Sequence, residues 1–126
     1  DETNCAVASY SVEEGYAAAK ILLERQKPLT AIFAMSDNLA FGAMRAVADR
    51  GKQVPGDVSV VGFDGMELAF YSIPRLTTLK QPGREMASAA VSLLLDMIQQ
   101  KAQAAHIHLE AKLVEGESVS TPAHYL

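Results

Sequence analysis

The sequence is short of cysteine and has no long hydrophobic run. Its 126 residues include one cysteine, Cys5, which excludes an internal disulfide and disfavours a cysteine-based zinc site. No apolar run approaches the roughly 20 residues that a bilayer-spanning helix needs, and no basic start followed by an apolar stretch indicates a secretory signal. We therefore expect no membrane partner and a reducing, cytoplasmic location.

Basic residues are also few. The chain has 11 Lys and Arg against 15 Asp and Glu, whereas surfaces that bind nucleic acid are usually basic. This segment itself is therefore not expected to bind DNA or RNA.

The motifs of common enzyme classes are missing as well. The sequence has no nucleophile elbow in a Ser-His-Asp order, no HExxH, no phosphate loop and no CxxC. The pair His106 and His108 lies far from His124, so exposed histidines are favoured over a metal site. We expect no catalytic residue, no cofactor and no metal.

What is present is a core-forming chain in which strand and helix patterns alternate. Hydrophobic residues make up 49% of it, enough for one domain of ordinary size. Strands are expected at 5–9, 31–35, 58–63 and 76–81, helices at 12–26, 38–50, 67–71 and 82–103, and a two-stranded return at 108–119.

Local signals mark the ends of these helices. Ser11 and Glu14 form a capping box. Ser36, Asp37 and Asn38 offer caps for the next helix, with Asp37 favoured as a cap over a ligand contact. Gly51 fits a left-handed C-terminal cap.

The alternation predicts an α/β fold, with a parallel sheet between layers of helices. In such sheets ligands bind outside the carboxyl ends of the strands. Tyr10, Ser36 and Asp64 each follow a predicted strand, as does Asp37. We expect these side chains to reach one rim of the sheet.

One long stretch resembles a known family. Residues 31–86, "AIFAMSDNLAFGAMRAVADRGKQVPGDVSVVGFDGMELAFYSIPRLTTLKQPGREM", resemble the effector-binding core of the lactose/galactose-repressor family of bacterial transcription regulators. The resemblance covers roughly Leu29 to Met97, and the whole chain more weakly. It implies a periplasmic-binding-protein-like fold, here incomplete, in which two subdomains close over a small, sugar-like effector.

The resemblance also implies which residues contact the effector. Asp64 matches an aspartate that accepts hydrogen bonds from ligand hydroxyls, and Tyr10 matches an aromatic that stacks on the ligand. Ser36 matches a polar contact position, where the short serine points to a different ligand or a bridging water. Gln81 flanks the cleft where the chain crosses between subdomains.

Two groups of residues match the family's homodimer surfaces. They are Phe41, Met44 and Arg45 on the second helix, and Phe70 with Tyr71 further on. The alternative for each is an ordinary core position. Similarly, Asp64 fits an Asp-Gly turn, and Tyr10 fits a core or surface aromatic.

The resemblance further implies that residues 82–103 form a crossover helix of the other subdomain, and that the DNA-binding domain lies outside this chain. An isolated copy is then expected to have an unpaired strand edge and an uncovered helix face.

The function expected is therefore the sensing part of a repressor. The alternative of the same fold is a periplasmic sugar-binding protein, which the stretch "IPRLTTLKQP" disfavours. A small α/β hydrolase or kinase-like enzyme is the alternative from another class, and it would need a paired base and nucleophile. The identity of the effector is left open.

Overall fold

The computed structural model describes residues 4–25 and 29–122. The chain divides into two compact units, Asp1–Lys80 with Leu113–Leu126, and Gln81–Lys112. Each unit is described by itself.

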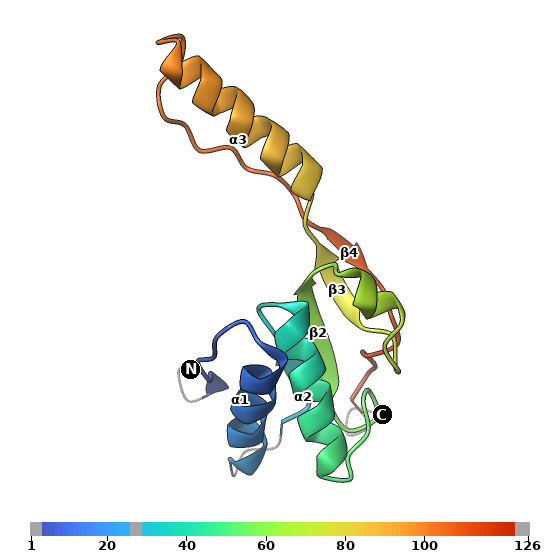
Figure 1. Cartoon of the computed structure of the whole chain (residues 1–126). Helices are drawn as coiled ribbons and strands as arrows, with labels where there is room; N and C mark the ends of the chain where they lie inside the picture. Colours follow the sequence, from blue (N-terminus) through green and yellow to red (C-terminus); the bar gives the residue numbers. More distant parts are fainter. Residues whose placement is uncertain (1–3, 26–28, 123–126) are drawn as a thin grey trace. The chain divides into compact units, whose positions relative to one another are not determined.

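The first unit is an α/β arrangement built on a short sheet (Figure 1). The sheet order is β1-β2-β3-β4, and β1 with β2 and β2 with β3 pair in parallel. The α/β prediction with a parallel sheet is thus confirmed. The elements are α1 (Val12–Glu24), β1 (Ala31–Phe33), α2 (Asp37–Asp49), β2 (Ser59–Asp64), the 3₁₀ helix η2 (Glu67–Phe70), β3 (Thr77–Lys80) and β4 (Lys112–Val114).

The core lies between α2 and one face of the sheet. Ile32 and Val60 are paired across β1 and β2 and are both buried. Phe33, on the opposite face of β1, is 57% exposed. Among the described residues of this unit, two of the three expected layers are therefore present, and β1 is an edge strand. The buried apolar residues are Ala19, Ile32, Ala34, Ala40, Ala43, Ala46, Val47, Val58, Val60, Ala69 and Leu76.

The helix ends follow the local signals. The Ser11 hydroxyl accepts from the Glu14 amide (3.1 Å), as the capping box predicts. Ser36 is the N-cap of α2 and accepts from the Leu39 amide (3.2 Å). The expectation that Asp37 caps this helix is therefore wrong. Gly51, at φ +69°, has the predicted left-handed conformation just after α2.

The predicted strand at 5–9 does not form. Cys5 and Val7 are both exposed. A strand needs a neighbour to satisfy its backbone groups. Here the Cys5 carbonyl instead accepts from the Arg25 guanidinium (3.0 Å).

The predicted two-stranded return at 108–119 is reduced to the single strand β4. The residues after it bond to the segment before and within β3 rather than to a hairpin partner. The amide of Glu117 donates to the Arg75 carbonyl (2.6 Å), and the amide of Gly116 donates to the Thr77 hydroxyl (3.0 Å).

The second unit consists of α3 (Gly83–Ile98) and the segment that follows it. No residue of α3 is buried. Within the unit, Met86 and Leu93 line an apolar hollow together with Ile107 and Leu109. The helix is shorter at both ends than the predicted 82–103, and its assignment to another subdomain stays a prediction.

None of the helices in residues 4–25 and 29–122 combines the length and the apolar character that a bilayer crossing would require.

Helices α1 and α2 are in close contact at Gly42, so a larger residue there should destabilise the fold. A Cβ added to Gly42 would collide with backbone atoms of Val12 and Tyr16 in α1. We expect Gly42→Ala to lower the free energy of unfolding by about 1–3 kcal/mol, because overpacking forces the two helices apart. Urea denaturation measures the change. Gly56→Ala is the control, since its Cβ would meet only the Gln53 side chain at 3.5 Å; equal losses in the two variants would contradict the packing argument.

The Arg75–Glu117 contact predicts a pH dependence. The Arg75 amide donates to Glu117 (3.1 Å) and its guanidinium forms an ion pair with the same carboxylate (3.1 Å). The backbone hydrogen bond first, and the guanidinium second, lower the pKa of Glu117 below its ordinary value of 4.5. A lowered folded-state pKa gives stability above the unfolded pKa that is lost as pH falls through the folded value.

We therefore expect wild type to be more stable than Glu117→Gln at neutral pH, and the difference to shrink as pH falls below about 4.5. Denaturation curves across this range, with Glu115→Gln as the control, measure it. A difference that is constant with pH would contradict the assignment.

Candidate functional site

The starts of α1 and α2 lie at the end of the first unit where β2 finishes (Figure 1). Two hydrogen bonds tie the neighbouring segments to the first turn of α2. Asn38 Nδ2 donates to the Tyr10 carbonyl (3.4 Å), and the Met66 amide donates to Asp37 Oδ2 (2.7 Å). The segments that carry Tyr10, Ser36 and Asp64 therefore meet at one place, although Tyr10 follows no strand.

Asp64 closes β2 in a conformation that few side chains adopt. It lies opposite Lys80 of β3, is half-buried, and has φ +128°, followed by Gly65 at φ +73°. A non-glycine residue with such a φ costs about 1–3 kcal/mol and persists only where its surroundings hold it. Strained residues of this kind cluster at functional sites, so the turn and binding interpretations of Asp64 are compatible.

The two glycines of the "GFDG" stretch make room for this turn. A Cβ on Gly62 would collide with the Asp37 carboxylate and with Leu76. A Cβ on Gly65 would lie 2.6 Å from the Lys80 side chain, and its positive φ also favours glycine. The turn therefore depends on both glycines.

Tyr10 is 72% exposed and directly precedes the N-cap of α1. That exposure excludes the core position that the sequence left open. Its backbone carbonyl accepts from Asn38 in the first turn of α2, its side chain is at the surface, and stacking on a ligand stays a prediction.

Ser36 is buried, unlike Tyr10 and Asp64, and Gln81 belongs to the second unit. Ser36 is 4% exposed, and its hydroxyl oxygen accepts from the Leu39 amide. Its hydroxyl retains a proton to donate, so contact with a ligand stays a prediction. Gln81 opens the second unit, and its role at a cleft is likewise a prediction.

Sequence reasoning missed the part that Asp37 and Thr78 play beside Asp64. Both residues are fully buried, and the Thr78 hydroxyl donates to Asp37 Oδ1 (2.5 Å). One sequence signal pointed to another role for Asp37: the preceding residue, Ser36, is itself a good N-cap, so Asp37 is not needed as one. Its partners, 29 and 41 residues away, left no trace in local spacing.

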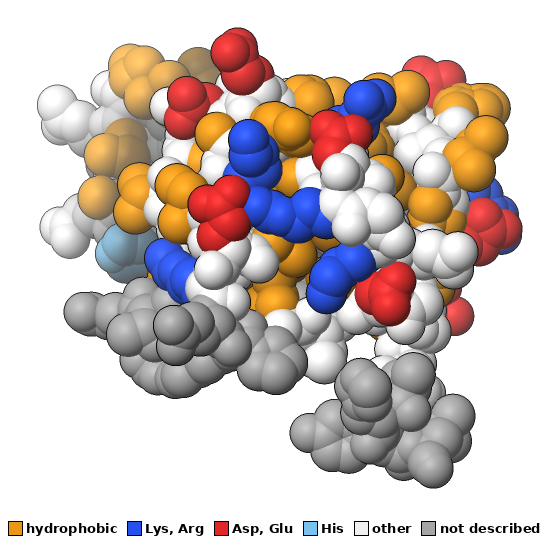
Figure 2. Space-filling view, turned by 90° about the horizontal axis from the view of Figure 1, so that it is seen from below, with side chains coloured by type: hydrophobic (Ala, Val, Ile, Leu, Met, Phe, Trp, Pro, Cys, Tyr) orange, Lys and Arg blue, Asp and Glu red, His pale blue; other side chains and the backbone are white. Residues whose placement is uncertain are grey.

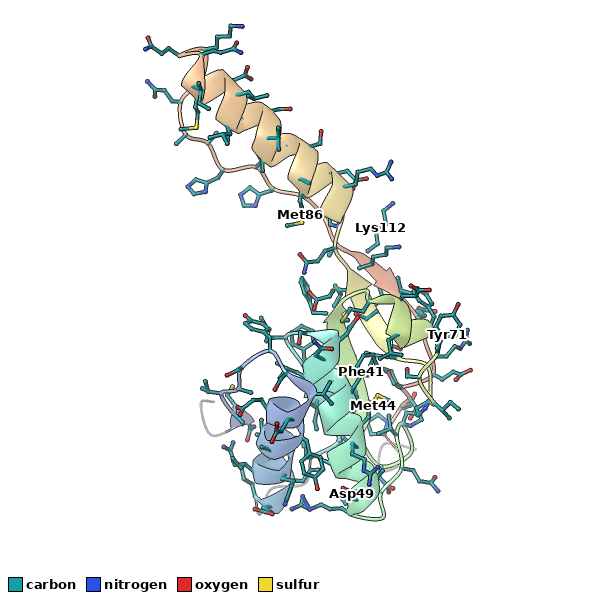
Figure 3. All side chains as sticks on the ribbon, viewed as in Figure 1. Phe41, Met44, Asp49, Tyr71, Met86 and Lys112 are labelled. Atoms are coloured by element: carbon teal, nitrogen blue, oxygen red, sulfur yellow. The ribbon has the colours of Figure 1, made fainter. Side chains whose placement is uncertain are left out.

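Three of the predicted dimer residues are labelled in Figure 3: Phe41 and Met44 on α2, and Tyr71 just after η2, all in the first unit. Phe41, Met44 and Arg45 line a shallow hollow together with Ser72 and Ile73. Ile73 is 96% and Tyr71 73% exposed. The residues beyond Tyr71 were not anticipated, although they continue the same surface.

This surface is uncommon for an isolated domain. Phe70 is also 44% exposed, so several large apolar groups face outward near one another. Contiguous exposed apolar patches mark sites of interaction.

Acidic and basic side chains lie next to one another on the face shown in Figure 2. Arg50 forms an ion pair with Glu24 (2.6 Å), and Arg45 with Asp49 (2.8 Å). No broad basic patch is visible on that face. In the part of the chain that the structure describes, no three His, Cys, Asp or Glu side chains are grouped as metal ligands would be.

A family profile matches almost the whole chain. The family described as periplasmic binding protein-like domain matches residues 1–119. The chain belongs to this family. The resemblance to the lactose/galactose-repressor branch of periplasmic-binding-protein-like domains is also confirmed, because the relatives are regulators of that type.

One such relative is the helix-turn-helix transcriptional regulator MalR of Clostridium butyricum. It is 43% identical over 109 residues, which cover 86% of this chain and 32% of the relative. The chain thus spans about a third of the length of the curated relatives it matches.

Solved structures agree with the periplasmic-binding-protein-like fold. The transcriptional regulator CelR in complex with cellobiose is 34% identical, with a TM-score of 0.88 over 94% of this chain and 36% of CelR. The lac repressor dimer bound to operator and the anti-inducer ONPF is 33% identical, with a TM-score of 0.83 over 90% of this chain and 40% of the other.

Proposed function

We propose that the chain is the C-terminal part of the effector-binding domain of a cytoplasmic bacterial repressor, and that its site takes a small sugar. The observation that carries the proposal is the junction at the first turn of α2. There an exposed aromatic ring and a strained, half-buried aspartate belong to segments that are hydrogen-bonded to the same helix start. The cellobiose complex of CelR supports a sugar as the ligand class.

The chemistry of these residues suits a polyol. A carboxylate has about four lone-pair positions, so Asp64 keeps capacity for hydroxyl donors beside its protein contacts. Hydrogen bonds to charged groups are worth about 1.5–3 kcal/mol each. Tyr10 offers a flat ring for the apolar face of a sugar, and Ser36 offers a hydroxyl donor at the edge of the same junction.

The proposed mechanism is a shift between two conformations of the effector-binding domain. A ligand that bridges two subdomains stabilises one orientation by its difference in affinity, typically about 1–3 kcal/mol. In a dimer that orientation sets the spacing of two DNA-binding heads, which must match the half-sites of an operator. These heads belong to a domain outside this chain.

The repressor is favoured over a periplasmic sugar-binding protein and over an enzyme. The relatives are named as transcriptional regulators. In the described residues around Asp64, the Thr78 hydroxyl donates to the Asp37 carboxylate, but both groups are fully buried and also bond to backbone amides, so this pair is not open to a substrate.

Substitution of Asp64 tests the site. We expect the wild-type protein to bind at least one of cellobiose, lactose, maltose and ribose, and Asp64→Asn to bind that sugar about tenfold or more weakly, because a charge-assisted acceptor is lost. Isothermal titration calorimetry measures the affinities.

Asp57→Asn is the matched control for this measurement. Asp57 precedes β2, and its carboxylate accepts from the Gln53 amide (2.7 Å). We expect its variant to bind sugar as wild type does. Undiminished binding by Asp64→Asn, or no binding of any of the four sugars by wild type, would contradict the proposed function.

The exposed surface beside α2 predicts homodimerisation. We expect Ile73→Glu to weaken the dimer at least about tenfold, since it places an unpaired charge in an apolar interface. Sedimentation equilibrium measures the dissociation constant. Ile21→Glu introduces the same charge at another exposed isoleucine, on α1; if both variants weaken the dimer equally, or neither does, the surface is wrongly assigned.

A further inference from the structure

The turn that carries Asp64 is fixed from beneath by two buried side chains. Asp37 Oδ2 accepts from the Met66 amide (2.7 Å), and its Oδ1 accepts from the Thr78 hydroxyl (2.5 Å). The Thr78 hydroxyl oxygen in turn accepts from the Gly65 amide (3.3 Å). The two amides that follow Asp64 are thus held by one carboxylate, directly and through a hydroxyl.

The burial of the Asp37 carboxylate indicates a role other than capping α2. Asp37 has no exposed surface, and a buried carboxylate is costly unless hydrogen bonds compensate it. Ser36 already caps α2, and an aspartate that only complements a helix start would do so at the surface. The bonds of Asp37 instead reach β3 and the turn after β2.

The same bonds explain how Asp64 keeps its strained backbone. A residue at φ +128° persists only where neighbouring contacts over-determine it. The contacts to Gly65 and Met66 act on the next two residues of the chain. Gly62 leaves the space that the Asp37 carboxylate fills, so the strand itself is shaped to admit this group.

We propose that Asp37 and Thr78 are positioning residues that aim the Asp64 carboxylate at the ligand without touching the ligand themselves. Both are fully buried, so a ligand contacts Asp64 and not the pair below it. This inference rests on the proposed function for its meaning in sugar binding. Its structural part, control of the turn, stands on the hydrogen bonds alone.

The chain offers a matched pair of variants for the test. Thr78→Val removes the hydroxyl beneath the turn, whereas Thr77→Val makes the same change at the adjacent buried threonine, whose hydroxyl accepts from the Gly116 amide instead. Thr78→Ser restores the hydroxyl. Asp37→Asn removes the charge, and if it fails to fold, the threonine variants carry the test.

The first readout is amide hydrogen exchange of the intact protein by NMR. We expect the Gly65 and Met66 amides to exchange at least about tenfold faster in Thr78→Val than in Thr77→Val, and Thr78→Ser to restore most of the protection. The Val60 amide, which donates to the Ser118 carbonyl (2.8 Å), is the internal reference for global opening. Equal protection of Gly65 and Met66 in the two valine variants would overturn the proposal.

The second readout is affinity for cellobiose, lactose, maltose and ribose. We expect Thr78→Val to bind the sugar that wild type binds about tenfold more weakly, with Thr77→Val unchanged and Thr78→Ser close to wild type. Unchanged affinity in Thr78→Val despite faster amide exchange would refute the positioning role. If wild type binds none of the four sugars, the proposed function fails, while the exchange result still decides whether Asp37 and Thr78 hold the turn.

Discussion

The buried carboxylate of Asp37 is the constraint on which the rest of the first unit depends. It lies against the inner strands β2 and β3 without exposed surface. It must therefore be satisfied by donors, and the donors are the Thr78 hydroxyl and the Met66 amide. Those bonds fix the start of α2, the end of β2 and the middle of β3 with respect to one another. Gly62 is required because the carboxylate occupies the space of a side chain there.

The sequence predicted those features that depend on near neighbours. A capping box spans three residues, and a glycine that ends a helix acts within one turn, so Ser11, Glu14 and Gly51 were sufficient evidence by themselves. The alternation of strand and helix patterns likewise restricts the sheet to parallel pairing.

The failures occurred where partners are distant in the sequence. Residues 5–9 have the composition of a strand, but composition does not supply a neighbouring strand. Residues 116–118 bond to residues 75–77, which lie about 40 positions earlier in the sequence, and these bonds form in place of the local hairpin. Asp37 has every local property of a cap, and its true partners become visible only when the sheet is assembled.

The junction and the apolar surface share two elements, which gives the proposed sensing a physical basis. Helix α2 starts at the junction and carries Phe41 and Met44 on the apolar surface. The 3₁₀ helix η2 follows the Asp64 turn almost directly and leads to Tyr71. In the proposed function, a ligand bound to Asp64 would act on a turn that is hydrogen-bonded to α2 and continuous with η2.

Such an arrangement favours a concerted response over a local one. Packed interiors have low compressibility and transmit strain, and the strained turn is held by the hydrogen bonds of Gly65 and Met66 to the buried Thr78 and Asp37. In the proposed function, a ligand that shifts the Asp64 carboxylate has two possible effects. It leaves the Asp37 contacts intact and moves α2 with the turn, or it breaks those contacts and releases the backbone strain at Asp64. In the proposed function, such a change is transmitted to Phe41 by a short route, because Met66, two residues after Asp64, is hydrogen-bonded to Asp37 at the start of the helix that carries Phe41.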